Sequence, residues 1–282
     1  MRNTFRILSL CLALVLMLSL LGCQTDPQQT QPNETDPVSG EKQINEVTGL
    51  KDKPVILFMG DSITDGGRTN YKDKTFLGAN HPKIVAQKLR QKFKNEEFIF
   101  YSTGVSGDTV LDQYFRLQED CFDLNPDYIV MLLGINDCWM GSYKNKETFE
   151  KSYRFLLDAM IANTDAKIIL IQPYLLPADD AMQANCVIAN VNGYKATATD
   201  IADVVCTMAA EYDLDIIYFA EILEQQHQKG AAYIELASDA IHPTALAATI
   251  LAEQIILKLG VKDFVPAFGE FDTSEIAAKY NK

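Results

Sequence analysis

The stretch Pro54-Val55-Ile56-Leu57-Phe58-Met59-Gly60-Asp61-Ser62 decides the fold class, because an apolar run of six residues leads directly into a polar turn. A short, continuously apolar run is typical of a strand that is buried on both faces of a parallel sheet. Ser62 then follows the carboxyl end of that strand, where open α/β sheets collect their ligands. The sequence therefore places Ser62 in a crevice at the edge of a sheet. Taken alone, Gly60-Asp61-Ser62 is also consistent with a simple helix cap.

Four more strand-like runs alternate with segments of helical periodicity. The strand-like runs cover residues 55–59, 97–101, 128–133, 167–172 and 215–219. The helical segments cover residues 84–93, 109–118, 146–161, 190–212 and 244–259. Strict alternation favours a parallel sheet with right-handed crossovers and helices on both faces. We therefore predict an α/β fold, a three-layer α/β/α sandwich with a flavodoxin-like five-stranded parallel sheet.

Residues 1–22 have the pattern of a secretory signal. Arg2 and Arg6 precede an apolar run over residues 7–21, which is short for a spanning helix and ends in Leu20-Leu21-Gly22-Cys23. This ending resembles a bacterial lipobox, which implies lipidation of Cys23 and attachment to a membrane surface. A plain signal peptide cleaved nearby, or an uncleaved anchor, are the alternatives. We expect an exported cell-envelope lipoprotein anchored to a bacterial membrane.

The predicted domain organisation follows from a change of composition near residue 54. Residues 23–53 begin with the predicted lipidated cysteine and are then rich in Gln, Thr, Pro, Asp and Glu, so they are expected to form a disordered tether. Residues 54–282 are long enough for one domain with a substantial core. The tail after Gly260 is expected to pack back onto this domain, with a loose terminus as the alternative.

Composition excludes several classes of partner. The formal charge is −13 and no basic cluster interrupts it, so nucleic acid and anionic lipid surfaces are not expected partners. The cysteines that remain beyond residue 23 can either pair or stay free: Cys121, Cys138, Cys186 and Cys206. No zinc-binding spacing, glycine-rich phosphate loop or dinucleotide fingerprint is present, so we expect neither a metal nor a cofactor.

A serine nucleophile needs a base, and the chain has only three histidines. His81 opens a predicted helix, and His227 lies in a polar helical segment. His242 lies in a loop three positions after Asp239, so one short turn lets the carboxylate accept from one imidazole nitrogen while the other faces a serine. We predict Ser62 as nucleophile, His242 as base and Asp239 as the group that orients the base. An ordinary helix-capping loop is the alternative for Asp239 and His242.

Acyl transfer also requires donors for the developing oxyanion. The candidates are the backbone N–H of Ser62, the backbone N–H of Gly104 and the side-chain amide of Asn136. Gly104 and Asn136 each follow a predicted strand, so they are expected at the same edge of the sheet as Ser62. A tight turn for Gly104 and an Asx turn or helix cap for Asn136 are the alternatives.

Together these blocks resemble the SGNH hydrolase superfamily, also called GDSL esterases and lipases. The stretches that carry the likeness are Gly60-Asp61-Ser62-Ile63-Thr64-Asp65, Ser106-Gly107-Asp108-Thr109, Gly134-Ile135-Asn136-Asp137 and Asp239-Ala240-Ile241-His242-Pro243. The resemblance covers roughly residues 54–259 and implies carboxylic ester hydrolysis through an acyl-serine at Ser62. Many relatives carry Asn where this chain has Ser102, so the hydrogen bond that supports this loop is expected to differ.

The segment Asp65-Gly66-Gly67-Arg68 resembles bacterial carbohydrate acetylesterases of the same superfamily, which implies O-acetyl groups on saccharides as substrates. We expect Asp61, Arg68 and Trp139 to contact the substrate; core packing and surface ion pairing are the alternatives. Two rival functions remain. A lysophospholipase or thioesterase would need a long apolar groove, and an inactive carbohydrate-binding lipoprotein would need a missing catalytic residue.

Overall fold

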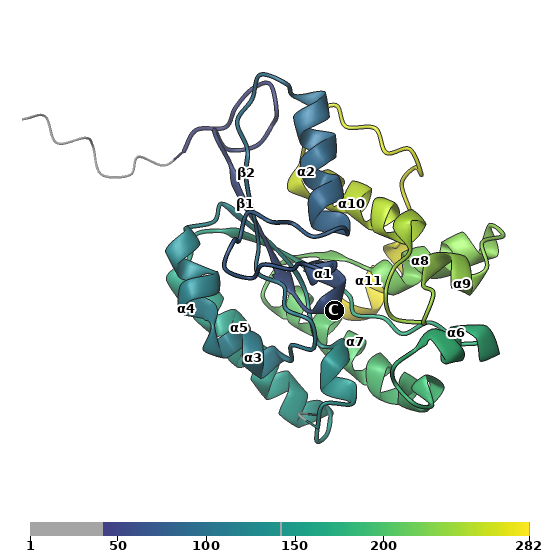
Figure 1. Cartoon of the computed structure of the whole chain (residues 1–282). Coiled ribbons are helices and arrows are strands. Elements are labelled where there is room, and N and C mark those ends of the chain that lie inside the picture. Colours follow the sequence, from purple (N-terminus) through teal and green to yellow (C-terminus); the bar gives the residue numbers. More distant parts are fainter. Residues whose placement is uncertain (1–41, 142, 282) are drawn as a thin grey trace, which may run out of the picture. The chain divides into compact units, whose positions relative to one another are not determined.

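Five parallel strands form one sheet in the order β2-β1-β3-β4-β5 in the computed structural model, which describes residues 42–141 and 143–281 (Figure 1). The strands are β1 (Val55–Gly60), β2 (Ile99–Ser102), β3 (Tyr128–Leu132), β4 (Lys167–Ile171) and β5 (Asp215–Ile217). This is the flavodoxin-like strand order, so the predicted fold class is confirmed. The order reverses direction at β1 and β3, and a crevice opens at such a switch point beyond the carboxyl ends of the strands.

Helices cover both faces of the sheet (Figure 1). One face carries α2 (His81–Lys92), α8 (Phe219–Gln228) and α10 (Ala245–Leu259). The other carries α3 (Val110–Phe115), α4 (Leu117–Asp120), α5 (Lys146–Asn163) and α7 (Lys195–Glu211). Strand side chains alternate between the two cores, as the pleat requires: Ile56 and Phe58 point to the first, Leu57 and Met59 to the second.

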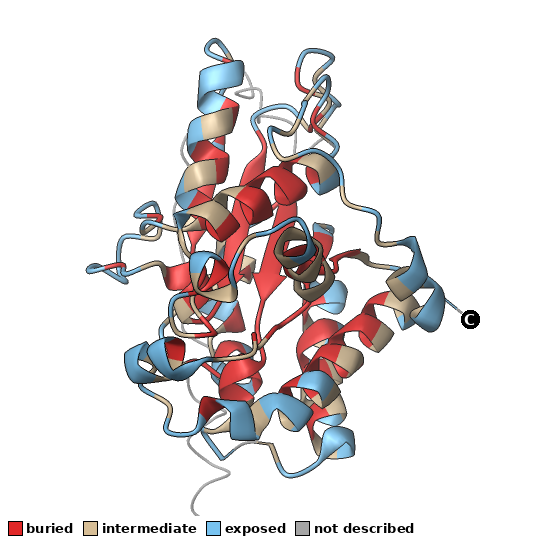
Figure 2. Cartoon of the chain, turned by 90° about the vertical axis from the view of Figure 1, so that its right-hand side faces the viewer, coloured by how far each residue is buried: buried red, intermediate tan, exposed pale blue. Residues whose placement is uncertain are grey.

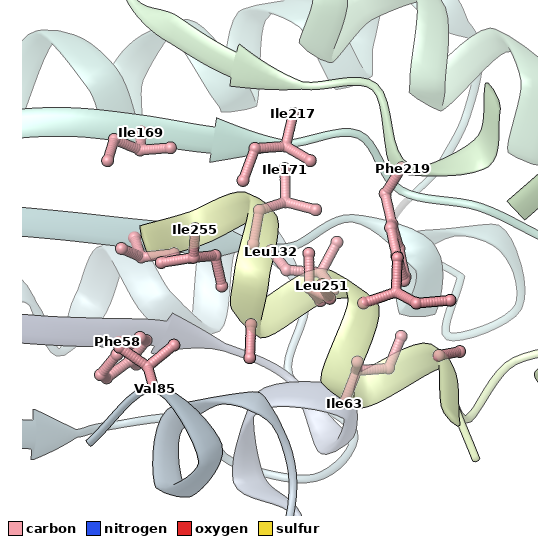
Figure 3. Close-up of a cluster of buried hydrophobic side chains, with 14 of the residues drawn as sticks. Phe58, Ile63, Val85, Leu132, Ile169, Ile171, Ile217, Phe219, Leu251 and Ile255 are labelled. Atoms are coloured by element: carbon pink, nitrogen blue, oxygen red, sulfur yellow. The ribbon is translucent and has the colours of Figure 1, made fainter. Parts of the chain in front are cut away.

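The first core packs strand side chains against α2 and α10. Figure 3 shows Val85 of α2 beside Phe58 of β1, and Leu251 and Ile255 of α10 lying over the middle of the sheet. The central strands β1 and β3 are buried along their whole length, whereas the helices turn exposed residues outward (Figure 2). A fully buried β1 fixes the position at which the chain turns into α1 (Ser62–Asp65).

Several element boundaries differ from the sequence-based prediction. The fifth strand ends at Ile217, and Phe219 starts α8. The predicted helix over residues 109–118 is split into α3 and α4 at Arg116, whose backbone is not helical at φ −108° and ψ 5°. Short elements that the periodicity missed are η1 (Phe122–Leu124), η2 (Ile135–Cys138), α6 (Asp180–Asn185), η3 (Val191–Tyr194), α9 (Tyr233–Leu236) and α11 (Ser274–Tyr280).

The folded region begins earlier than residue 54, which corrects the expected boundary of the tether. Leu50 is fully buried in the first core, and Ile44 pairs with Lys51 in an antiparallel bridge. Lys42 Nζ lies 2.6 Å from a carboxylate oxygen of Asp127. One buried leucine and a few polar contacts are therefore enough to fold residues 42–53 onto the domain. The predicted signal, Cys23 and the rest of the tether lie outside the described residues.

The tail after α10 packs back on the domain, as predicted. Gly260 ends α10 in the left-handed conformation (φ 86°), and the three following phenylalanines pack on the first core: Phe264, Phe268 and Phe271. α11 then packs on the second core, where Tyr280 donates to Asp203 at 2.6 Å.

The four cysteines of the described region are free thiols. None of the helices in that region is long and apolar enough to cross a membrane.

Candidate active site

The turn between β1 and α1 presents Ser62, the predicted nucleophile. Gly60 has φ 149°, and a Cβ added there would lie 2.2 Å from the carbonyl oxygen of Leu132, so only glycine fits. Asp61 caps α1, because its Oδ1 accepts from the N–H of Ile63 at 2.9 Å. Ser62 is the first residue of α1, so its own N–H has no partner within the helix. The turn thus holds a hydroxyl and a free donor at the carboxyl edge of the sheet.

Ser62 meets His242 across 180 residues of sequence. Ser62 Oγ lies 2.8 Å from His242 Nε2, and His242 Nδ1 lies 2.6 Å from Asp239 Oδ2. With the proton on Nδ1, the imidazole donates to Asp239 and its Nε2 accepts from the serine hydroxyl. Asp239 Oδ1 also accepts from the N–H groups of Ile241 at 3.0 Å and His242 at 2.7 Å, which fixes the loop. The structure therefore brings the predicted nucleophile, base and orienting group into one hydrogen-bonded chain.

This chain sets the protonation of its members. The hydrogen bond to Asp239 raises the pKa of His242 above its ordinary value, against the opposing effect of burial, and the negative charges of Asp239 and Asp61 add to it. Burial alone would raise the pKa of Asp239, but the hydrogen bonds from His242 and Ile241 outweigh it and hold that pKa below its usual range. Asp239 is therefore charged at neutral pH, ready to stabilise a protonated imidazole.

Two further donors lie on neighbouring loops. The loop after β2 continues the parallel pairing, because Thr103 N–H donates to Phe58 O at 2.9 Å and Val105 N–H to Gly60 O at 3.1 Å. Between them Gly104 packs tightly against α1, and its N–H forms no hydrogen bond within residues 42–141 and 143–281. Asn136 is nearly buried in η2, and its side-chain amide donates one hydrogen to Asp108 O at 3.0 Å. The second amide hydrogen is left to donate to an oxyanion.

Asp61 is a second carboxyl beside His242. Its side chain is completely buried, so the prediction that it contacts the substrate is wrong. Burial raises its pKa to about 7, even though the N–H of Ile63 and the charge of His242 both favour the ionised form. Among the described residues, Asp61 Oδ2 has no hydrogen-bond partner. Asp61 is thus a helix cap whose charge state changes near neutral pH.

Arg68 also differs from expectation. It is 4 % exposed, and its Nη1 donates to the carbonyl oxygen of Gly104 at 3.1 Å, while Nη2 donates to that of Asp73 at 3.3 Å. Backbone carbonyls thus occupy both Nη atoms of Arg68, so the alternative of a surface ion pair is wrong, while contact of Arg68 with a substrate stays a prediction. Arg68 holds the Gly104 loop from behind.

Trp139 and the other two histidines occupy separate places. Trp139 is half-buried directly after η2, with its ring edge-to-face against Tyr194 at 5.8 Å between centroids. The contact of Trp139 with a substrate stays a prediction.

His81 is buried against Phe58, and burial lowers its pKa to about 3. His227 stacks on Tyr233 and its Nδ1 lies 2.8 Å from Ala231 O.

Sequence reasoning missed Tyr174 and did not resolve Ser102. Tyr174 is buried, and its hydroxyl has no partner in the described part of the chain. Burial, together with the charges of Asp239 and Asp61, raises the pKa of Tyr174 well above its ordinary value, which places it near both carboxyls. Its position three residues after β4, at the carboxyl edge, could have identified it. Ser102 Oγ likewise finds no partner among the described residues, in line with an altered support for this loop.

Known proteins with similar sequences and folds are esterases and lipases. A model of the GDSL-like lipase/acylhydrolase family matches residues 58–250. An acetylxylan esterase of Geobacillus stearothermophilus is 25 % identical over 217 residues, which is 73 % of this chain and 93 % of that protein. A crystal structure of an acetylxylan esterase from the same organism has a TM-score of 0.61 at 24 % identity and covers 74 % of this chain and 95 % of its own.

A second solved structure, of a Parabacteroides merdae protein assigned as a GDSL-like lipase, has a TM-score of 0.65 at 24 % identity and covers 77 % of this chain and 98 % of its own. Structures at this identity support the fold alone. The family model, by contrast, spans most of the chain, from β1 to α10, and includes the Ser62 and His242 loops. The chain therefore belongs to the GDSL-like lipase/acylhydrolase family, within the SGNH superfamily of carboxylic ester hydrolases.

Proposed function

We propose that the protein is a serine esterase that removes small acyl groups, above all O-acetyl groups on saccharides. One observation carries the mechanism: Ser62 Oγ, the His242 imidazole and the Asp239 carboxylate form a continuous hydrogen-bonded chain, with contacts of 2.8 and 2.6 Å. Both distances are those of strong hydrogen bonds, so the serine has a base in place before substrate arrives.

In the acylation step, Ser62 Oγ attacks the carbonyl carbon of the ester while its proton passes to His242 Nε2. The carbonyl electron pair moves onto the oxygen, and the N–H groups of Ser62 and Gly104 and the amide of Asn136 stabilise that charge. Asp239 stabilises the imidazolium through Nδ1. His242 then returns the proton to the departing sugar hydroxyl as the carbon–oxygen bond breaks, which leaves an acyl-serine.

Deacylation repeats the sequence with water. His242 Nε2 takes a proton from the water that attacks the acyl carbon, and the same donors hold the second oxyanion. The imidazolium then protonates Ser62 Oγ as the carboxylic acid leaves. Since the base must be neutral at the start of both steps, activity is expected to fall as the pH drops below the raised pKa of His242.

Two observations support a saccharide acetate as substrate. The acetylxylan esterase of Geobacillus stearothermophilus matches most of the length of this chain. Beside η2, the half-buried Trp139 and Tyr194 form an aromatic pair of the kind on which a sugar ring can stack. The acetyl group is small, so it requires no long acyl groove.

A chain-length panel tests the proposal. Turnover of p-nitrophenyl esters from acetyl to dodecanoyl is measured beside acetate release from acetylated xylooligosaccharides, with Ser62→Ala as the control. We expect kcat/KM to be highest for acetyl and acetate release from the sugars to be abolished in the control. Faster turnover of long chains would favour a lysophospholipase or thioesterase, and inactivity toward every ester would favour a carbohydrate-binding lipoprotein.

We also propose that lipidation of Cys23 anchors the enzyme at the cell envelope, so that its partners are the membrane and a small ester rather than nucleic acid. The sequence Leu20-Leu21-Gly22-Cys23 supports this. Metabolic labelling with an alkyne fatty acid should mark the wild type and not Cys23→Ser. Equal labelling of both would exclude Cys23 as the lipidated residue.

A further inference from the structure

A cavity of about 320 Å³ lies behind the loop that carries Gly104. This volume is at the small end of the range for small-molecule sites, about 300–1,000 Å³. The loop after α1, the loop after β2 and α4 enclose it. Its lining consists of Arg68, Tyr71, Lys72, Thr103, Val105, Arg116, Glu119 and Asp120.

Two buried polar atoms on this lining lack hydrogen-bond partners within the described residues: Arg68 Nε and Thr103 Oγ1. Arg68 is 4 % exposed and Thr103 is 2 % exposed. Buried polar atoms are nearly always paired, and one left unpaired destabilises a protein by about 1–3 kcal/mol. Because Nε can only donate, the missing partner of Arg68 is an acceptor. The threonine hydroxyl can donate or accept, which suits an oxygen-rich ligand.

The charge of the cavity wall argues against an anion as ligand. Arg116 is already engaged, since its Nε donates to Asp120 at 2.8 Å and its guanidinium also pairs with Asp108. Lys74, next to the cavity, pairs with Asp120 at 3.1 Å. Apart from Lys72, these cations are already engaged, so the wall presents cations and carboxylates side by side, which offers donors and acceptors without a strong net field.

Tyr71 adds an aromatic surface to this polar lining. The residue is 46 % exposed, and its hydroxyl donates to Asp65 Oδ2 at 3.3 Å, which holds the ring in place. The Arg68 guanidinium lies 5.4 Å from the ring centroid. A ring face beside mixed donors and acceptors is the chemistry that recognises the hydroxyl groups and C–H face of a neutral sugar.

We propose that this cavity is a saccharide subsite, which takes a neutral sugar residue adjacent to the one whose ester reacts at Ser62. The inference depends on the proposed function and names a second part of the same substrate. The link to the reaction runs through the Gly104 loop, because Thr103 precedes Gly104 and Arg68 donates to the Gly104 carbonyl. A sugar held by Arg68 and Thr103 thus positions the substrate chain against the loop that carries an oxyanion donor.

Three larger cavities of the described region do not compete for this role. One of about 430 Å³ lies around Ile217, Leu257 and Phe271, and one of about 480 Å³ lies between α8 and α11. A third, of about 360 Å³, lies at the start of β4 and β5, around Lys167 and Asp215. None of the three is lined by an unpartnered buried polar atom, and all lie by β5 or beyond it, away from β1 and β2.

Thr103→Val tests the subsite, because it removes the hydroxyl and keeps the shape of the side chain. Acetylated xylooligosaccharides of one to four residues are compared with p-nitrophenyl acetate. We expect the ratio of kcat/KM for the longer oligosaccharides to that for p-nitrophenyl acetate to fall at least fivefold, mainly through KM. Tyr71→Ala, which changes an exposed ring, should lower the same ratio. Thr164→Val, at the opposite edge of the sheet, should not change it.

The outcomes separate the two proposals. If the wild type cleaves p-nitrophenyl acetate and no acetylated saccharide, the proposed function fails and the subsite falls with it. If acetylated saccharides are cleaved but KM is independent of chain length and unchanged in Thr103→Val and Tyr71→Ala, the function stands and the subsite is overturned. Titration of Ser62→Ala protein with unacetylated xylotriose and with glucuronate adds a direct measurement, and tighter binding of glucuronate would overturn the neutral-sugar assignment.

Discussion

The turn after β1 and the loop before α10 each place one aspartate beside His242, and the two carboxyls behave in opposite ways. Asp61, in the turn, is completely buried with a single hydrogen bond, and its pKa is raised to about 7. Asp239, in the loop, has a side chain 14 % exposed that accepts from Ile241 and twice from His242, and its pKa is lowered. Burial therefore dominates the carboxyl in the nucleophile turn, whereas hydrogen bonds dominate the carboxyl in the base loop.

This difference predicts that the two regions fail in different ways. Changes in the β1–α1 turn that alter the volume of a buried side chain disturb packing and should lower stability as well as rate. Changes of His242, whose side chain is 38 % exposed, should lower rate with little loss of stability. Changes in the two regions should lower kcat equally only where they break the same hydrogen-bonded chain, that of Ser62 and His242.

Removing either end of the hydrogen-bonded chain tests that unit and has the largest expected effect. Ser62→Ala and His242→Ala should each lower kcat on p-nitrophenyl acetate by about 10⁵–10⁶-fold, because neither group acts without the other. The double variant should lose no more than the single ones. Losses that multiply in the double variant would show that Ser62 and His242 act independently.

Asp239→Asn tests whether Asp239 orients the His242 ring, because it should leave the structure of the loop unchanged. The asparagine Oδ1 can still accept from the N–H groups of Ile241 and His242, but its amide cannot accept from His242 Nδ1, which disfavours the reactive tautomer. We expect kcat to fall about 10³–10⁴-fold. The hydrogen bond that raises the pKa of His242 is lost, so the acidic limb of the kcat/KM profile should move to lower pH. An acidic limb at the wild-type pH would contradict this assignment.

The sequence was sufficient to locate this chemistry because every site block follows a strand that ends at the same edge. Ser62 after β1, Gly104 after β2 and Asn136 after β3 need only the rule that parallel strands align their carboxyl ends. His242 was identified by its spacing from Asp239, a local feature that a short turn satisfies. Fold class and site position therefore followed from short-range patterns.

Burial could not be predicted in the same way, because it depends on what distant segments cover. Arg68 looks like a surface residue in sequence, yet its guanidinium is enclosed by the carbonyls of Gly104 and Asp73. The N-terminal boundary was misplaced because one buried leucine, Leu50, and a few polar contacts fix an otherwise polar segment onto the domain. Such contacts leave no periodic signal.

Gly104→Ala tests the packing of the oxyanion loop against the nucleophile turn. A Cβ there would lie 2.7 Å from the backbone nitrogen of Asp65 and 2.9 Å from Thr64 Cβ, so the loop must shift. We expect kcat to fall about 10²–10³-fold as one donor is displaced, and the free energy of unfolding to fall by about 1–3 kcal/mol. Gly230→Ala, which strains the backbone at φ 110° but adds its Cβ in open space, is the control for a loss of stability away from the site and should leave kcat unchanged. A wild-type kcat in Gly104→Ala would remove Gly104 from the oxyanion site.

Asp61→Asn has the smallest expected effect on rate. Its effect on the pH dependence of stability should be opposite in sign to that of Asp239→Asn. The asparagine keeps the Oδ1 cap to Ile63, so the turn persists. Because the folded-state pKa of Asp61 is raised to about 7, the unfolded chain loses this proton first as the pH rises from about 4 to 7, and the wild type is progressively destabilised over that interval. Asp61→Asn removes this pH-dependent destabilisation, so its free energy of unfolding relative to the wild type should rise by on the order of 3–4 kcal/mol between pH 4 and pH 8, measured by urea unfolding.

For Asp239→Asn the free energy of unfolding relative to the wild type should instead fall as the pH rises. The lowered pKa of Asp239 stabilises the wild type above about pH 4, and that contribution is lost in acid. A stability difference for Asp61→Asn that is constant with pH would mean that folding does not raise the pKa of Asp61, and the contrast between the two regions would then rest on packing alone.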